Sequence, residues 1–243
     1  MNLNGKAALV TGGAHRVGRA FALGLARAGA DVLIDYHSSE TDAANTVAEV
    51  RALGRRAEAV RADVADEADV RRLVGACRDA FGRLDVLVNS ASLFHSAPVE
   101  QTTTADWNRS LAVNLTGPFL LSREAAPLLR ADGGGLIVNI ADLSAFQPWP
   151  SYVAHAVSKA GLVHLTRVLA RALGPHVRVN CIAPGTVLPP VGYTEAESDP
   201  KGARRVLERE GSPDDAVRAL LYFVEADFVT GEVAVVDGGR MLL

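Results

Sequence analysis

The sequence predicts an α/β protein in which helices cover both faces of a parallel sheet, and three observations support this fold class. The chain has 243 residues, of which 49% are hydrophobic, enough for one domain with an extensively buried core. Short β-rich runs alternate with longer segments whose apolar residues recur at helical spacing. No linker, repeat or low-complexity tract interrupts this alternation. This order is typical of a doubly wound sheet in a single domain, residues 1–243.

Seven runs rich in β-branched residues are expected to form the strands of this sheet. They lie at residues 7–11, 31–35, 56–61, 86–89, 136–140, 177–182 and 233–236. Helical spacing is clearest at residues 17–28, 67–81, 118–131 and 152–173. Ligands of such sheets bind beyond the carboxyl ends of the strands, so functional residues are expected in the segments that follow them.

Composition and charge argue against several classes of partner. The net charge is -3, and the 25 basic and 28 acidic residues are interspersed, so no patch for nucleic acid or an anionic membrane is expected. The first apolar run is too short for a signal peptide, and no stretch approaches the ~18 apolar residues of a membrane span. Cys77 and Cys181 lack metal-ligand or disulfide spacing and are expected to be buried. We expect a cytoplasmic protein that acts on a small molecule without a metal.

The first strand is followed by a glycine-rich turn, TGGAHRVG at residues 11–18, that opens an apolar-periodic helix. Gly12 allows a tight turn, and Gly18 allows the helix to pack closely on the sheet. The amino terminus of the helix presents N–H groups to a pyrophosphate. Because strand, turn and helix occur in this order, the segment predicts a dinucleotide site.

The end of the second strand indicates which dinucleotide is bound. An acidic residue at the ribose favours NAD, and Asp35 is present. Strand alternation, however, sends Asp35 and Tyr36 to opposite faces, and we place Tyr36 at the discriminating position. Arg16 supplies positive charge nearby, which favours NADPH. Three further side chains can donate hydrogen bonds to a 2′-phosphate: His37, Ser38 and Ser39.

Further motifs occur in the order in which one enzyme family carries them. Residues 11–18 are similar to TGxxxGxG, Asp63-Val64 to a pair that binds adenine, and residues 89–92 to NNAG. Asn114 is similar to an active-site asparagine, and Pro184-Gly185 to a turn before a substrate loop. Over nearly its whole length the chain thus resembles the short-chain dehydrogenase/reductase family, which implies a Rossmann-type fold. The cofactor contacts so implied are Gly12, His15, Arg16, Val17, Tyr36, His37, Ser38, Ser39, Asp63, Val64, Asn89, Ser90, Ala91, Lys159, Pro184 and Gly185.

Within that family the chain is most similar to the pteridine reductases. Those enzymes carry TGxxxRxG, and Arg16 matches the arginine. Ser92 and Phe94 resemble the serine and the stacking phenylalanine that hold a pterin ring. Asp142 matches an aspartate that these reductases have where most relatives place a catalytic serine. A flat heteroaromatic ring can stack on Phe94, and its amino-pyrimidine edge needs polar partners such as Ser92.

The chain departs from the family at its YxxxK motif. The motif ends at Lys159, but four residues earlier stands His155 where the family has tyrosine. On a helix His155 and Lys159 share a face, whereas Tyr152 lies about 10 Å from Lys159 along the axis. His155 is therefore the positional substitute. The resemblance implies that Lys159 holds the nicotinamide ribose and that the catalytic group comprises Asn114, Asp142, His155 and Lys159.

The reaction so implied is hydride transfer from NADPH to a C=N or C=O bond, with a proton from a neighbouring side chain. Histidine ordinarily titrates near neutrality and is a competent acid, so His155 can be the donor. Asp142 can be the donor instead if its pocket favours the protonated form, with His155 or water relaying protons. The substrate contacts are expected to be Arg16, Ser92, Phe94, Asp142 and His155.

Three functions remain open. The first is an NADPH-dependent reductase of a pterin or dihydrofolate-like ring. The second is a short-chain oxidoreductase for an unrelated carbonyl or alcohol, because fold does not determine function. The third is a non-catalytic NADPH-binding protein, for which only His155 argues. The resemblance also implies a homotetramer and a substrate loop at residues 186–211, whose closure would exclude water.

Overall fold

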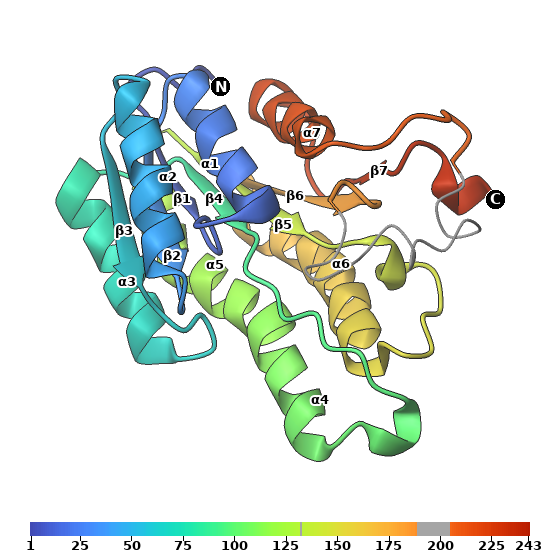
Figure 1. Cartoon of the computed structure of the whole chain (residues 1–243). Helices are drawn as coiled ribbons and strands as arrows, with labels where there is room; N and C mark the ends of the chain where they lie inside the picture. The colour runs from blue at the N-terminus through green and yellow to red at the C-terminus, as the bar shows by residue number, and fades with distance from the viewer. Residues whose placement is uncertain (132, 189–204) are drawn as a thin grey trace.

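The computed structural model describes residues 1–131, 133–188 and 205–243 of the chain (Figure 1). Its centre is one seven-stranded sheet in which every pairing is parallel and the order is β3-β2-β1-β4-β5-β6-β7. The predicted fold class and the number of strands are thereby confirmed. The strands are β1 (Ala7–Val10), β2 (Asp31–Tyr36), β3 (Ala57–Arg61), β4 (Val86–Asn89), β5 (Gly135–Ile140), β6 (Val177–Pro184) and β7 (Val233–Val236).

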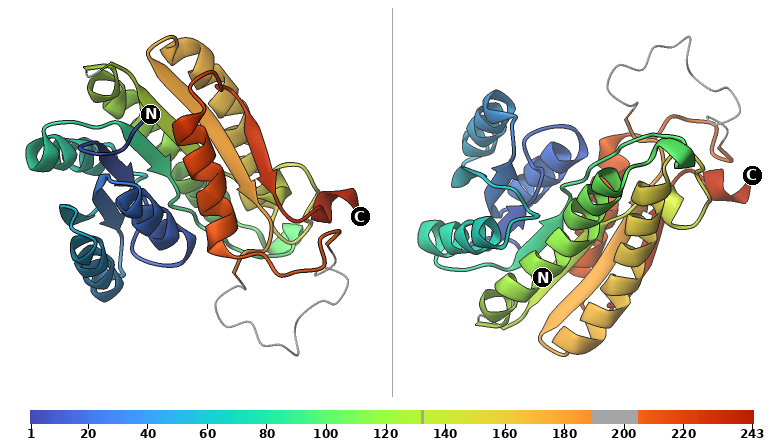
Figure 2. Two further views of the ribbon diagram at one scale, coloured as in Figure 1. Left: turned by 90° about the horizontal axis from the view of Figure 1, so that it is seen from above. Right: turned by 90° about the horizontal axis from the view of Figure 1, so that it is seen from below.

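Helices cover both faces of the sheet, and Figure 2 shows the two layers from above and below. One face carries α1 (Arg16–Arg27), α2 (Glu40–Ala52) and α7 (Pro213–Glu225). The other carries α3 (Glu67–Phe81), α5 (Gly117–Ala131) and α6 (Val153–Leu173). The short helix α4 (Thr104–Leu111) continues through a π-helical turn, η2 (Ala112–Thr116), into α5. None of the helices in the described part of the chain is long and apolar enough to cross a membrane.

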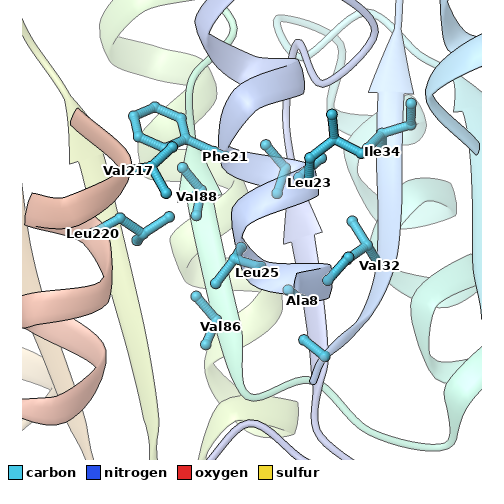
Figure 3. Close-up of a cluster of buried hydrophobic side chains, with 14 of the residues drawn as sticks. Ala8, Phe21, Leu23, Leu25, Val32, Ile34, Val86, Val88, Val217 and Leu220 are labelled. Carbon is cyan, nitrogen blue, oxygen red and sulfur yellow. The ribbon is translucent and has the colours of Figure 1, made fainter. Parts of the chain in front are cut away.

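The two faces of each central strand contribute to separate cores. In β1, Ala8 and Val10 pack under α1 and α7, whereas Ala7 and Leu9 pack on the opposite side. Figure 3 shows the first core, where side chains of α1 and α7 meet above β4. Because both faces of the strand are buried, β1 is a continuous apolar run without alternation. This burial holds the carboxyl ends of the strands in one rigid row.

The predicted boundaries of helices and strands differ from the observed ones where a helix-capping residue or pairing with a neighbouring strand determines the end of the element. The fourth predicted helix begins at Val153, because Tyr152 has non-helical backbone angles and caps it. The sixth strand extends two residues further to Pro184, because it pairs there with Val236 of β7. The sequence pattern did not predict α2, in which four residues form the buried side: Ala43, Thr46, Val47 and Val50. Of the substrate loop predicted at residues 186–211, residues 189–204 lie outside the described part of the chain.

Replacing Leu220 by alanine should destabilise the fold by about 2–5 kcal/mol, because this side chain of α7 is fully buried against α1. The free energy of unfolding in urea measures the effect. The matched control is Glu225→Ala, on the exposed side of the same helix, which should change it by less than about 0.5 kcal/mol. Equal losses in the two variants would contradict the role given to this core.

Candidate active site

The site lies at the carboxyl edge of the sheet, where β1 and β4 are neighbours. The hydroxyl of Thr11, directly after β1, accepts hydrogen bonds from the backbone N–H groups of Ser90 (3.0 Å) and Ala91 (3.1 Å), directly after β4. From the end of β1 the chain continues into α1, on one face of the sheet. From the end of β4 it continues through α4 into α5, on the other face. Neighbouring strands whose connections diverge in this way leave a crevice between them.

The glycine-rich turn fits closely into this crevice. Gly12 has φ +62°, and a Cβ atom there would lie 2.9 Å from Cα of Ala91. A Cβ atom on Gly18 would lie 2.1 Å from the carbonyl oxygen of Gly12. His15 caps α1 without a side-chain hydrogen bond to the helix, which leaves backbone N–H groups of the first turn for an anion. The turn therefore has the cradle that a dinucleotide pyrophosphate needs.

A cavity of about 290 Å³ extends from this turn to the end of β2. Asp35 is buried, and its Oδ1 accepts a hydrogen bond of 2.6 Å from the N–H of Gly12. Tyr36 is half-buried and lines the cavity. Asp35 lines the same cavity but has its carboxyl group engaged by the turn. Further predicted cofactor residues on this wall are His37, Ser38, Ser39, Asp63 and Val64.

Arg109 also lines this cavity, and the sequence analysis missed it. Its Nη1 lies 2.9 Å from Oδ2 of Asp63. Burial raises the pKa of Asp63, but hydrogen bonds from Ala65 N–H and Arg109 more than offset this and lower it. Arg109 lies on α4, whose existence was not predicted, and it comes next to Asp63 only through packing.

A second cavity, of about 330 Å³, adjoins the first and shares Gly12, His15, Ala91 and Ser92 with it. Volumes near 300 Å³ are the lower end of the range for small-molecule pockets. Its wall brings together residues from five separate parts of the sequence. Predicted site residues on it are Arg16, Val17, Ser90, Phe94, Asp142, His155, Lys159, Pro184 and Gly185.

Asp142 and His155 are in direct polar contact at this cavity. Nε2 of His155 lies 2.7 Å from Oδ2 of Asp142, and Nδ1 of His155 lies 3.0 Å from the carbonyl oxygen of Leu93. Burial raises the pKa of Asp142, but the hydrogen bond from His155 and the charge of Lys159 outweigh it and lower the value to about 2. The pocket therefore does not raise the pKa of Asp142, which was the condition for an acid that is protonated at rest, because hydrogen bonds and positive charge stabilise its anion.

Lys159 lies one helical turn beyond His155 and is also buried. Its Nζ donates a hydrogen bond of 2.8 Å to the carbonyl oxygen of Ile140, at the end of β5. Burial lowers the pKa of Lys159, and the negative charge of Asp142 opposes this effect. The amino group of Lys159 is thus held at the edge of the cavity by the end of β5, where its charge acts on Asp142.

Asn114 lies behind the cavity wall, on the π-helical turn η2, a type of turn that is frequent at functional sites. Its Oδ1 accepts a 2.7 Å hydrogen bond from Leu93 N–H, and its Nδ2 donates to the carbonyl oxygen of Leu93 and to Oγ of Ser158, both at 3.0 Å. Asn114 therefore positions the segment that carries Leu93. Asn89 is also buried, and its Nδ2 donates to Oδ1 of Asn139 (2.8 Å), which links β4 to β5.

Phe94 belongs to an aromatic cluster above His155. Its ring is stacked on Tyr152, with the centroids 4.5 Å apart, and meets Trp149 and His155 edge to face. Tyr152, the tyrosine nearest to the expected motif position, is thereby engaged in packing. Phe94 remains 47% exposed and lines the second cavity, so part of its ring is open to a ligand.

Asp35→Asn is expected to remove a pH dependence from the stability of the fold. Burial raises the pKa of Asp35 from 3.8 to about 7 against the opposing hydrogen bond from Gly12. The folded protein keeps this proton where the unfolded chain has lost it, so the contribution is fully present below pH 3.8 and is lost as pH rises through about 7. Inside this window the loss is about 1.4 kcal/mol per pH unit at most.

Unfolding in urea at several pH values between about 4 and 8 measures this effect. The difference in the free energy of unfolding between the native protein and the Asn variant should shrink as pH rises across this window and become constant above it. Parallel stability curves would contradict the raised pKa.

Known proteins share both the fold and the sequence of this chain. The family model described as enoyl-(acyl carrier protein) reductase matches residues 12–240. An L-rhamnose 1-dehydrogenase (NAD(P)(+)) from a Sphingomonas species is 36% identical, with 98% of this chain and 96% of that protein covered. Two solved structures are also similar to this chain over nearly its whole length.

The first is a short-chain dehydrogenase from Burkholderia cenocepacia in complex with NADP, with a TM-score of 0.92, 38% identity, and coverage of 99% of this chain and 100% of that one. The second is FolM alternative dihydrofolate reductase 1 from Brucella canis complexed with NADP, with a TM-score of 0.91, 35% identity, and coverage of 100% and 97%. Together with the glycine turn and the Lys159 position, these matches show that the chain belongs to the short-chain dehydrogenase/reductase family.

Proposed function

We propose that this protein is an NADPH-dependent reductase that transfers hydride to a C=N or C=O bond of a pterin or dihydrofolate-type ring. One observation carries the proposal: the cavity beside the glycine turn is lined together by Arg16, Ser92, Phe94 and Asp142. Each of these side chains suits a flat, polar-edged heteroaromatic ring. His155 and Lys159 border the same space and supply proton chemistry.

NADPH is the cofactor that the two adjoining cavities fit. The turn leaves no room for a side chain at Gly12 or Gly18 and offers backbone N–H groups to the pyrophosphate. Similar chains from Burkholderia cenocepacia and Brucella canis bind NADP. When bound, NADPH supplies the hydride, and Lys159 would hold its nicotinamide ribose. Donors for its 2′-phosphate would be Tyr36, His37, Ser38 and Ser39.

The substrate side of the proposal depends on Phe94 and its surroundings. One face of the ring packs on Tyr152, which prevents the phenylalanine from turning away, and the 47% exposed remainder forms a platform. The hydroxyl of Ser92 lies 3.3 Å from Oδ1 of Asn114 and is held at the cavity wall. The similarity to an alternative dihydrofolate reductase supports a ring of this class.

A second candidate is an oxidoreductase for a carbonyl or alcohol outside the pterin class. The 36% identity to an L-rhamnose dehydrogenase favours it as much as the FolM likeness favours a pterin. A third candidate, a non-catalytic NADPH-binding protein, depends on the replacement of tyrosine by His155. Turnover of any substrate in the panel described below would exclude it.

We also propose that the protein is a homotetramer in the cytoplasm. Large apolar side chains are exposed on α5, α6 and α7 and at the carboxyl terminus, where exposure in a monomer would be a liability. Both cysteines are free thiols, which suits a reducing compartment. Sedimentation velocity tests the tetramer, and cell fractionation tests the location. The exposed side chains are Phe119, Val157, Val168, Tyr222, Leu242 and Leu243.

Gly12→Ala should weaken NADPH binding by about tenfold or more, because its Cβ atom would meet the backbone of Ala91. The fluorescence of bound NADPH measures the dissociation constant. Gly54→Ala is the matched control, since Gly54 also has a positive φ (+77°) but has no atom within 4 Å of the added Cβ. Both variants are strained, and only the first should lose affinity. Unchanged affinity in Gly12→Ala would place the cofactor elsewhere.

The substrate class is tested by NADPH consumption with dihydrobiopterin, dihydrofolate and a panel of ketones and sugars. We expect turnover of a pterin, with KM increased about tenfold by Phe94→Ala through loss of ring stacking. Phe146→Ala is the control, because Phe146 is similarly exposed (41%) but is not among the residues that line the second cavity. Turnover of ketones or sugars alone would favour the second candidate.

A further inference from the structure

The hydrogen bonds of His155 require more protons than a neutral imidazole carries. A neutral ring has one N–H and one lone pair, yet both nitrogens of His155 face acceptors. The carbonyl oxygen of Leu93 can only accept, so Nδ1 must carry a hydrogen. Nε2 lies 2.7 Å from a carboxylate oxygen of Asp142, and a hydrogen is needed there as well. Two hydrogens are thus needed along this chain of three groups.

Neighbouring groups do not remove this requirement. Nδ2 of Asn114 lies 3.4 Å from Nδ1 of His155, but its two hydrogens are directed to Leu93 and Ser158 at 3.0 Å each. The other oxygen of Asp142 accepts from the N–H (2.8 Å) and the hydroxyl (2.5 Å) of Ser144. The second hydrogen therefore belongs to the contact between His155 and Asp142.

The charged groups around the pair act on Asp142 and keep its carboxyl group ionised. Described titratable side chains around the pair include Lys159 on the same helix, Tyr152 at the helix cap and Cys181 on β6, and Arg16 at the start of α1 lines the same cavity. Burial raises the pKa of Cys181 to about 11, so the thiol stays neutral. The hydrogen bond from His155 and the charge of Lys159 lower the pKa of Asp142, so its carboxylate is the acceptor in the contact with Nε2 of His155.

The two members of the pair differ in their access to the cavity. The side chain of His155 is 1% exposed and both of its nitrogens are engaged, whereas the side chain of Asp142 is 21% exposed. A substrate atom can therefore approach the carboxyl group but not the ring nitrogens.

We infer that Asp142 and His155 hold one transferable proton between them, that Asp142 delivers it to the substrate, and that His155 returns it to Asp142. This inference rests on the proposed function for its substrate. Hydride adds to the carbon of the C=N or C=O bond, the π electron pair moves to nitrogen or oxygen, and that atom takes the proton from the carboxyl group. The Nε2 proton of His155 passes to Asp142, which leaves a neutral imidazole and a carboxylate. One proton from water restores the pair. Asp142 is then the catalytic acid, and His155 is a positioning residue that acts through it.

Nuclear magnetic resonance of protein with isotopically labelled histidines tests the shared proton without any substrate. At about pH 7 both ring nitrogens of His155 should carry hydrogen, and in Asp142→Asn only one should. His155→Gln identifies the signals by their loss. A bare Nε2 in the native protein would overturn the inference. Because this readout needs no turnover, it stands even if no pterin or carbonyl is reduced and the proposed function fails.

The pH profile of kcat tests the direction of transfer. In His155→Gln, which keeps a donor beside Asp142 but no transferable proton, kcat should fall about a hundredfold at about pH 8 and recover towards about pH 5.5 with KM unchanged. Asp142→Asn should lose activity at every pH. His164→Gln, on the exposed side of α6, is the matched control and should behave as the native protein. An equal loss at all pH values in His155→Gln, or retained activity in Asp142→Asn, would overturn the inference.

Discussion

The hydrogen bonds between Thr11 and the backbone that follows β4 hold the two halves of the sheet together at the point on which the site depends. At this point the chain leaves β1 for α1 on one face and leaves β4 for α4 and α5 towards the other. The resulting crevice is narrow, because Gly12 approaches the backbone of Ala91 more closely than any Cβ atom permits. Both cavities share these two residues, so one contact shapes them both.

Burial of the strands on both faces makes this contact rigid. Ala8 and Val10 belong to one core, and Ala7 and Leu9 belong to the other, so β1 cannot move relative to either helix layer without opening a cavity. Buried amides extend the connection across the sheet. Asn89 bonds to Asn139, whose own Nδ2 donates to Thr166 of α6 (2.9 Å). The helix that carries His155 and Lys159 is thereby tied to the central strands at whose ends the glycine turn lies.

Replacement of a phenol by an imidazole at position 155 changes the hydrogen-bond capacity of the site. A phenol has one oxygen that both donates and accepts, whereas an imidazole has two nitrogens at opposite edges of its ring. In this protein Nδ1 of His155 is hydrogen-bonded to the carbonyl oxygen of Leu93. The same oxygen also accepts a hydrogen bond from Asn114, which holds it in place. The imidazole is therefore fixed between Leu93 and Asp142, and the carboxyl group is the member of the pair with access to the cavity.

The aromatic cluster gives the substrate side of the cavity its shape. Phe94, Trp149 and Tyr152 come from two loops and a helix cap, and they support each other by edge and stacking contacts. Such loops vary independently of the sheet, so membership of a family does not determine the substrate.

The sequence by itself determined the fold class, the strand positions and the location of the glycine turn. These features follow from local periodicity and from the steric demands of single residues, and both are visible in the sequence. It also placed His155 one turn from Lys159, because helical spacing is regular. Three features of the site were decided only by the tertiary structure. They are the pairing of Arg109 with Asp63, the carbonyl group of Leu93 opposite His155, and the ionised state of Asp142. Each depends on groups far apart in the chain, and the last depends on the balance between burial and hydrogen bonds. Such contacts form only when separate elements pack together, and no local pattern records which side chains will meet.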